Sequence, residues 1–136
     1  MVLNRVGVWV DHREAYVIRP GHDGDAEAEV VVVPSQAERQ SRRASDWEKG
    51  PFEPLQQQAD NERQRKYTAE LNQYYDKVID HIGAVDALLI FGPGEAPGEL
   101  RKRLKPQDFN GVHIEVQRAD RMTRDQLIAH VRRAES

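Results

Sequence analysis

Residues 85–104 of the chain read VDALLIFGPGEAPGELRKRL. The segment Asp86–Phe91 contains five consecutive apolar residues, too few to cross a membrane and without polar alternation, which predicts a strand buried on both faces. A turn rich in glycine and proline follows, and a short helix begins at about Pro97, a residue favoured in a first helical turn. A buried strand that runs through a tight turn into a helix is typical of an α/β sheet.

The turn after this strand also predicts an anion-binding site, formed at Gly92, Gly94 and Gly98. The first amides of a helix have no partner within the helix, so they can donate hydrogen bonds to a bound anion. Basic side chains follow closely in the same segment, and phosphate is the anion that we expect. They are Arg101, Lys102, Arg103 and Lys105.

Length and composition limit the classes of protein that this chain can be. Its 136 residues predict one domain, spanning 1–136, with a sizeable core. The absence of cysteine excludes a disulfide scaffold and a thiol nucleophile, and it fits a reducing cytoplasm. No apolar run has membrane length, and the N-terminus enters a strand rather than a signal peptide. We therefore expect a cytoplasmic protein without a membrane partner.

The remaining elements follow from hydrophobic periodicity and turn residues. A long helix from Leu55 to Gly83 carries an apolar stripe in its second half and an almost wholly polar first half. Residues 35–53 show no periodicity and are expected to form a mobile loop. The other predicted elements are strands at Val6–Val10, Ala15–Ile18, Ala28–Val33 and Val112–Val116, and a helix opened by the capping box Thr123–Gln126.

The resulting order, βββαβαβα, predicts an α/β fold with a mixed five-stranded sheet and helices packed on it. The short gap between the first two strands indicates an antiparallel hairpin. This order matches the ribonuclease H-like arrangement, in which the first and fourth strands are parallel neighbours. The turns that follow these two strands should then lie at the same edge of the sheet.

The whole chain resembles the middle domain of archaeal and eukaryotic class-I peptide-chain release factors and of the ribosome-rescue factor Pelota. The opening strand Val6–Val10 with Asp11 and Ala15 is similar to the opening hairpin of that domain. A long insertion, a long Arg-rich helix and an apolar strand running into a glycine turn follow in the same order. The resemblance, shared with bacterial single-domain relatives described as translational-machinery-like proteins, implies a role in translation and a ribosomal partner.

One departure from that family concerns catalysis. Release factors carry a Gly-Gly-Gln tripeptide between the third strand and the long helix, where it places a water at the peptidyl-tRNA ester. Residues 44–52 of this chain read ASDWEKGPF, with a single glycine followed by proline. The nearest glutamines, 56–58, have no glycine before them, so the backbone freedom of a glycine pair is missing. The sequence therefore favours a protein that is not an enzyme.

The tripeptide Asp11-His12-Arg13 has two interpretations. Polar residues are usual in a short hairpin turn, where aspartate is readily accepted. With Glu14, the same residues could form the catalytic site of a hydrolase whose phosphate or ester substrate lies at the Gly92–Gly98 turn. A metal-dependent nuclease is disfavoured because the exit of the fourth strand, Phe91-Gly92-Pro93, has no carboxylate. The histidines lack zinc-ligand spacing, and we expect neither a metal nor a cofactor.

Clusters of basic residues favour a non-catalytic protein that associates with structured RNA or the ribosome. Arginine and lysine neutralise phosphates, and an exposed tryptophan offers a stacking surface for a base. A third alternative is an interaction module, in which the exposed first strands and the tyrosine-rich helix pair with a second copy to form a homodimer. The predicted RNA-binding residues are Arg39, Arg42, Arg43, Trp47, Arg63, Lys66, Arg101, Lys102, Arg103 and Lys105.

Overall fold

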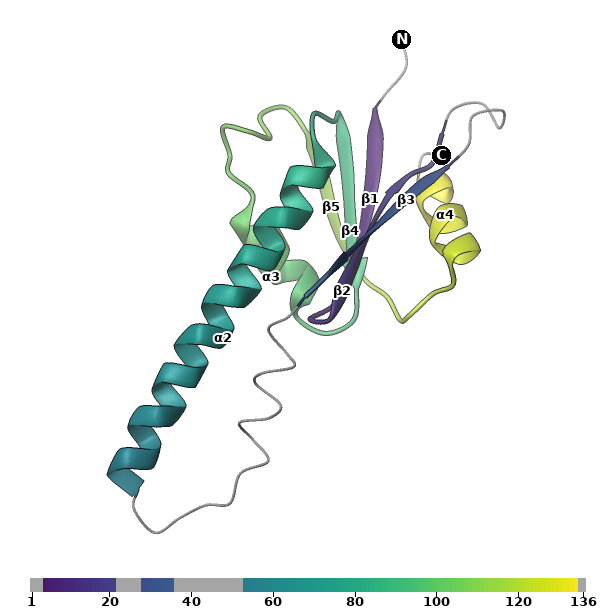
Figure 1. Cartoon of the computed structure of the whole chain (residues 1–136). Coiled ribbons are helices and arrows are strands. Elements are labelled where there is room, and N and C mark those ends of the chain that lie inside the picture. Colours follow the sequence, from purple (N-terminus) through teal and green to yellow (C-terminus); the bar gives the residue numbers. More distant parts are fainter. Residues whose placement is uncertain (1–3, 22–27, 36–52, 135–136) are drawn as a thin grey trace.

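A computed structural model describes residues 4–21, 28–35 and 53–134, with side chains from residue 61 onward in the long helix. Figure 1 shows a twisted sheet with helices on both faces and one long helix extending well past it. The elements are β1 (Arg5–Val10), β2 (Glu14–Arg19), β3 (Glu29–Pro34), α2 (Glu53–Ile82), β4 (Ala87–Gly92), α3 (Ala96–Arg103), β5 (His113–Arg118) and α4 (Arg124–Arg133).

The five strands form one mixed sheet in the order β3-β2-β1-β4-β5. The pairs β1–β2 and β2–β3 are antiparallel, whereas β1–β4 and β4–β5 are parallel. The predicted α/β class, the element order and the hairpin between the first two strands are confirmed. Burial of the fourth strand is confirmed for Leu88 to Phe91, which are at most 3% exposed, whereas Asp86 is exposed and precedes the strand.

The larger half of the core lies between the sheet and the helices α2 and α3. Strand residues such as Val8 and Ile90 pack here against Leu100 of α3. The predicted stripe of α2 supplies Leu71, Tyr74, Tyr75, Val78 and Ile82, all buried, while Tyr67 and Ile79 are partly buried. Gly83 follows with φ of 68°, the left-handed conformation that ends a helix.

The first part of α2 projects away from the sheet (Figure 1). An α-helix rises about 1.5 Å per residue, so thirty residues span about 45 Å, more than the width of a small domain. Burial of the α2 stripe begins at Leu71, and residues 61–66 are mostly exposed. The sheet therefore holds α2 by its C-terminal half alone.

The opposite face of the sheet is covered by α4. The predicted capping box is present: the Thr123 side chain accepts from the Gln126 amide, and the Gln126 side chain accepts from the Thr123 amide. Leu127, Ile128 and Val131 pack on Trp9, Ile18, Leu89 and Phe91. The helix approaches closely because β1 has Gly7 beneath it, where a Cβ would lie 2.3 Å from a Val131 methyl carbon.

Candidate functional site

The turns after β1 and β4 lie side by side at the carboxyl ends of these two parallel strands. Parallel pairing of Trp9 with Phe91 continues the two strands into Asp11 and Gly92. Gly92 has φ of 151°, and a Cβ there would lie 2.2 Å from the Val10 carbonyl oxygen. The carboxyl ends of parallel strands are where α/β sheets commonly hold ligands, so these strand ends are a candidate site.

His12 contacts the helix that follows β4. Its Nε2 lies 3.0 Å from Glu99 Oε1, and the two side chains are 36% and 37% exposed. The same carboxylate oxygen accepts a 2.6 Å hydrogen bond from the Tyr75 hydroxyl of α2. Burial raises the pKa of Tyr75 above its ordinary value, and the hydrogen bond with Glu99 raises it further. A buried tyrosine thus holds the carboxylate that orients a half-exposed imidazole.

Asp11, one of the predicted catalytic residues, stabilises its own turn. Its Oδ1 accepts hydrogen bonds of 2.8 Å from the amides of Arg13 and Glu14. Its backbone carbonyl accepts a 2.9 Å hydrogen bond from the Tyr74 hydroxyl. These contacts match the turn interpretation of Asp11, because each fixes the backbone between β1 and β2.

Glu14 belongs to a second network, which Asp11 also joins because Arg121 Nη1 lies 3.8 Å from Asp11 Oδ2. Its Oε2 accepts hydrogen bonds from the Tyr16 hydroxyl at 2.5 Å and from Arg121 Nη2 at 2.6 Å. The hydrogen bond with Glu14 is the main reason that the pKa of Tyr16 is raised. The Arg121 guanidinium also lies 5.8 Å from the centre of the Trp9 ring. Glu14 therefore connects β2 to the segment after β5 rather than facing His12.

The glycine turn differs electrostatically from the expected anion site. Gly94 has φ of 62°, and a Cβ there or at Gly98 would meet nothing within 4 Å. The residues flanking the first turn of α3 are acidic, however, with Glu95 at the N-cap and Glu99 one turn later. The basic residues Arg101, Lys102 and Arg103 lie in its last turn. Negative charge near the first amides disfavours an anion there, and α3 keeps its positive charge at the other end.

Some of the predicted RNA-binding residues lie on two adjacent helices. Lys66 is exposed on the projecting part of α2, and Arg63 is partly exposed beside it. Arg101, Lys102 and Lys105 are exposed in and after α3. Arg103 instead pairs with Asp76 of α2 through contacts of 2.9 and 3.0 Å, so its charge ties the two helices together. Arg39, Arg42, Arg43 and Trp47 lie outside the described residues, as does most of the predicted mobile loop 35–53.

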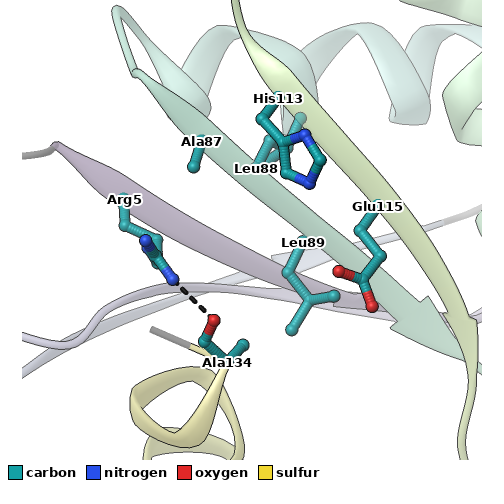
Figure 2. A pocket seen from close by; sticks show the side chains of 7 residues that line it. All are labelled: Arg5, Ala87, Leu88, Leu89, His113, Glu115 and Ala134. Atoms are coloured by element: carbon teal, nitrogen blue, oxygen red, sulfur yellow. Dashed lines mark hydrogen bonds between the residues drawn. The ribbon is translucent and has the colours of Figure 1, made fainter. Parts of the chain in front are cut away.

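A small cavity of about 190 Å³ opens on the α4 face of the sheet. Figure 2 shows Ala87 and Leu89 of β4 between Arg5 on one side and His113 and Glu115 of β5 on the other. Arg5 Nη1 donates a 2.7 Å hydrogen bond to the Ala134 carbonyl at the end of α4. The cavity is smaller than the few hundred cubic ångströms typical of organic ligand sites. It lies at the opposite end of β4 from His12.

Neither a metal centre nor a membrane span is found in the described part of the chain. No group of three or more histidine, aspartate or glutamate side chains there could hold a metal ion. Likewise, none of the helices in that part is both long and apolar enough to cross a bilayer.

Two residues of the site were missed by the sequence analysis. Glu99 and Tyr75 complete the contact with His12, whereas the predicted partners Asp11 and Glu14 do not. A signal for Glu99 was available. Parallel neighbours β1 and β4 bring the first turn of the next helix, as well as the glycine turn, to His12. For Tyr75, the only sequence signal was its position on the apolar stripe of α2. That position indicates burial but does not identify a hydrogen-bond partner.

No protein-family model and no curated protein matches this sequence significantly. The resemblance to the release-factor middle domain therefore stays a prediction.

Proposed function

We propose that this chain is a non-catalytic protein that associates with RNA or the ribosome, with a ribonuclease H-like fold similar to the release-factor middle domain. The order β3-β2-β1-β4-β5, with β1 and β4 parallel neighbours, supports this proposal because it is the arrangement expected for that fold. The long helix after the third strand also occupies its expected place.

The observation that carries the proposal is the position of the exposed basic residues on α2 and α3. These helices cover the same face of the sheet and are joined by the Arg103–Asp76 ion pair. Arg65 and Lys66 lie on the projecting part of α2, and Arg101 and Lys102 lie on the exposed side of α3. Two separated groups of positive charge suit the repeating phosphates of a nucleic-acid backbone, which position a protein without reading the base sequence.

Binding to transfer RNA and co-sedimentation with ribosomes test the proposal at low and moderate salt. Since each phosphate contact releases counterions, the affinity should fall steeply as salt rises. The double variant Arg101→Ala/Lys102→Ala should weaken binding to all sequences alike and lower the salt slope by about 0.7–0.9 for each lost contact.

The matched control is Arg124→Ala/Arg133→Ala, which removes two exposed arginines from α4 on the opposite face. This variant should bind as the parent does. Equal weakening by both double variants would mean that net charge matters rather than the α2–α3 face. Absence of salt-sensitive binding by the parent protein would refute the proposal.

The absence of the Gly-Gly-Gln tripeptide has a separate test. Residues 44–52 offer no glycine pair with a following glutamine. The purified protein should bind ribosomes that carry peptidyl-tRNA without releasing the peptide. Release of peptide would show that another group on this chain performs the hydrolysis.

The contact between His12 and Glu99 favours hydrolysis as a second candidate function. In the tautomer that donates from Nε2 to Glu99, Nδ1 keeps its lone pair and can accept a proton. A water attacking an ester carbonyl would pass its proton to Nδ1, and the imidazolium would return that proton to the leaving alkoxide.

This second candidate is tested with 4-nitrophenyl acetate as the ester. Removal of a general base costs roughly 10²- to 10⁴-fold in rate. We expect that loss in His12→Gln, while His81→Gln, which changes an exposed histidine at the end of α2, should keep the parent rate. Equal rates in the two variants would mean that His12 is not a general base and serves only to join the turn to α3.

A further inference from the structure

The two edges of the sheet differ in how they are protected. Exposed edge strands usually carry charges or bulges that prevent pairing with another chain. The edge strand β5 has Glu115 and Arg118 along its length. The opposite edge strand, β3, has four consecutive valines, 30–33, and its Val32 side chain is 52% exposed. Among the described residues, the sheet ends at β3.

Two hydrogen bonds determine which groups of β3 point outward. The Ser35 amide donates to the Arg13 carbonyl at 2.7 Å, so odd-numbered residues of β3 direct their amides and carbonyls toward β2. The Asp11 amide donates to the Glu14 carbonyl, so even-numbered residues of β2 direct their backbone groups toward β1. Odd-numbered residues of β2 therefore face β3, and they pair with odd-numbered residues of β3, which gives the same alternation independently. Since directions alternate along a strand, Val30 and Val32 present their backbone groups at the outer edge.

Pro34 is consistent with this alternation. It occupies the next outward-facing position, where its missing amide costs no hydrogen bond within the sheet. The outer edge therefore offers an amide donor and a carbonyl acceptor at both Val30 and Val32, and only a carbonyl acceptor at Pro34. Its complete hydrogen-bonding segment is centred on Val31.

We propose that β3 pairs antiparallel with β3 of a second copy of this chain, across a two-fold axis at Val31. Val30 of each copy then lies opposite Val32 of the other, and four backbone hydrogen bonds form. The two sheets become one sheet of ten strands. This inference is independent of RNA binding, since it uses the edge of the sheet rather than the exposed sides of α2 and α3.

A second copy fits this edge because the edge is complementary to itself. The two-fold axis places valine against valine on both faces of the new pair, and β-branched pairs across strands are favourable. The charge pattern is also compatible. Glu29, the one charged residue of β3, would face Val33 of the second copy, and Arg19 of its own sheet lies 3.8 Å from its carboxylate. No like charges meet across the axis.

Sedimentation equilibrium of the full chain tests the proposal. At micromolar concentration and above, the mass should be twice the 15.6 kDa of one chain. Val32→Lys adds the charge that natural edge strands use against pairing, and this variant should sediment as a monomer. The matched control is Val116→Lys on β5, which changes another exposed valine, 44% exposed, and should remain dimeric. A monomeric parent, or equal effects of the two lysines, would overturn the proposal.

The register has its own test, which uses the absence of cysteine in the chain. A non-hydrogen-bonded antiparallel pair brings two Cα atoms to about 4.5 Å, within reach of a disulfide. Val31→Cys should therefore cross-link two copies under mild oxidation. Glu29→Cys is exposed but would lie about 14 Å from its equivalent, and it should not cross-link. A dimer in which Val31→Cys fails to cross-link would disprove pairing at this axis.

Discussion

Three consecutive residues of α2, Tyr74, Tyr75 and Asp76, fix the direction of the long helix. Each makes a different contact: Tyr74 donates to the Asp11 carbonyl, Tyr75 donates to Glu99, and Asp76 accepts from Arg103. The two tyrosines are buried, at 3% and 1% exposure, so the hydrogen bonds of their hydroxyls are partly shielded from water. A helix held at one end by specific contacts can project in a defined direction.

The two tyrosine hydroxyls should contribute unequally to the free energy of unfolding, because one donates to a carboxylate and the other to a backbone carbonyl. Hydrogen bonds to charged groups contribute about 1.5–3 kcal/mol, and those between neutral groups about 0.5–1.5 kcal/mol. Tyr75→Phe, which loses the bond to the Glu99 carboxylate, should therefore lower the free energy of unfolding more than Tyr74→Phe. Urea denaturation of both variants measures the difference. The reverse order would mean that Glu99 is satisfied by His12 alone.

The same tyrosines predict a loss of stability at high pH. Burial is the main reason that the pKa values of Tyr74 and Tyr75 are raised above 10.0 in the folded protein. Above pH 10 the unfolded chain loses these protons while the folded chain keeps them. The free energy of unfolding should fall by about 1.4 kcal/mol per pH unit for each tyrosine.

Denaturation as a function of pH measures this fall, and below about pH 10 these tyrosines should cause no pH dependence of the free energy of unfolding. The variant Tyr74→Phe/Tyr75→Phe should have a shallower slope above pH 10. Some slope should remain, because the pKa of Tyr16 is raised as well. An unchanged slope would mean that other groups cause the alkaline loss.

At the scale of elements, the packing of α4 on β1 depends on one missing side chain. Gly7 lies under Val131, and a Cβ there would lie 2.3 Å from one methyl carbon of that valine and 3.2 Å from the other. The first distance is far below van der Waals contact, and the second is slightly below it. The helix could keep its place above an alanine only if the valine or the helix moved.

Gly7→Ala should therefore destabilise the protein by about 1–3 kcal/mol, the usual cost of overpacking. In a Val131→Ala background the methyl groups are absent, and the same glycine substitution should cost much less. A double-mutant cycle by urea denaturation gives the coupling between the two positions. Equal costs in both backgrounds would place the strain elsewhere.

At the scale of the whole molecule, the long helix makes the protein elongated (Figure 1). The sheet and the core layer that it shares with α2 and α3 hold the C-terminal half of α2, while the first half extends outward with its basic residues. This shape separates the positive charges of α2 from those of α3. A binding surface of that extent suits a large, extended polyanion.

Small-angle X-ray scattering tests the projection of α2. A compact chain of this length would have a radius of gyration of about 14 Å. The Val32→Lys variant, expected to be monomeric, should give a clearly larger value. A radius near that of a compact chain would mean that the first half of α2 folds back onto the sheet in solution.

Local sequence patterns determined the elements and their order. Five apolar residues in succession made β4 a buried strand, and steps of three and four residues defined the stripe of α2, because burial follows the period of each element. The apolar run, the capping box and the glycine at the end of α2 are short-range signals, and the structure confirms all three.

Only the tertiary structure decided which residues meet at the candidate site and which backbone groups of β3 face outward. His12 and Glu99 are 87 positions apart, and they meet because β1 and β4 pair in parallel and α3 then folds over their ends. The outward alternation of Val30 and Val32 likewise depends on the register of β2 with β3. Such contacts depend on how separate elements dock, and the periodicity within each element contains no information about its neighbour's register.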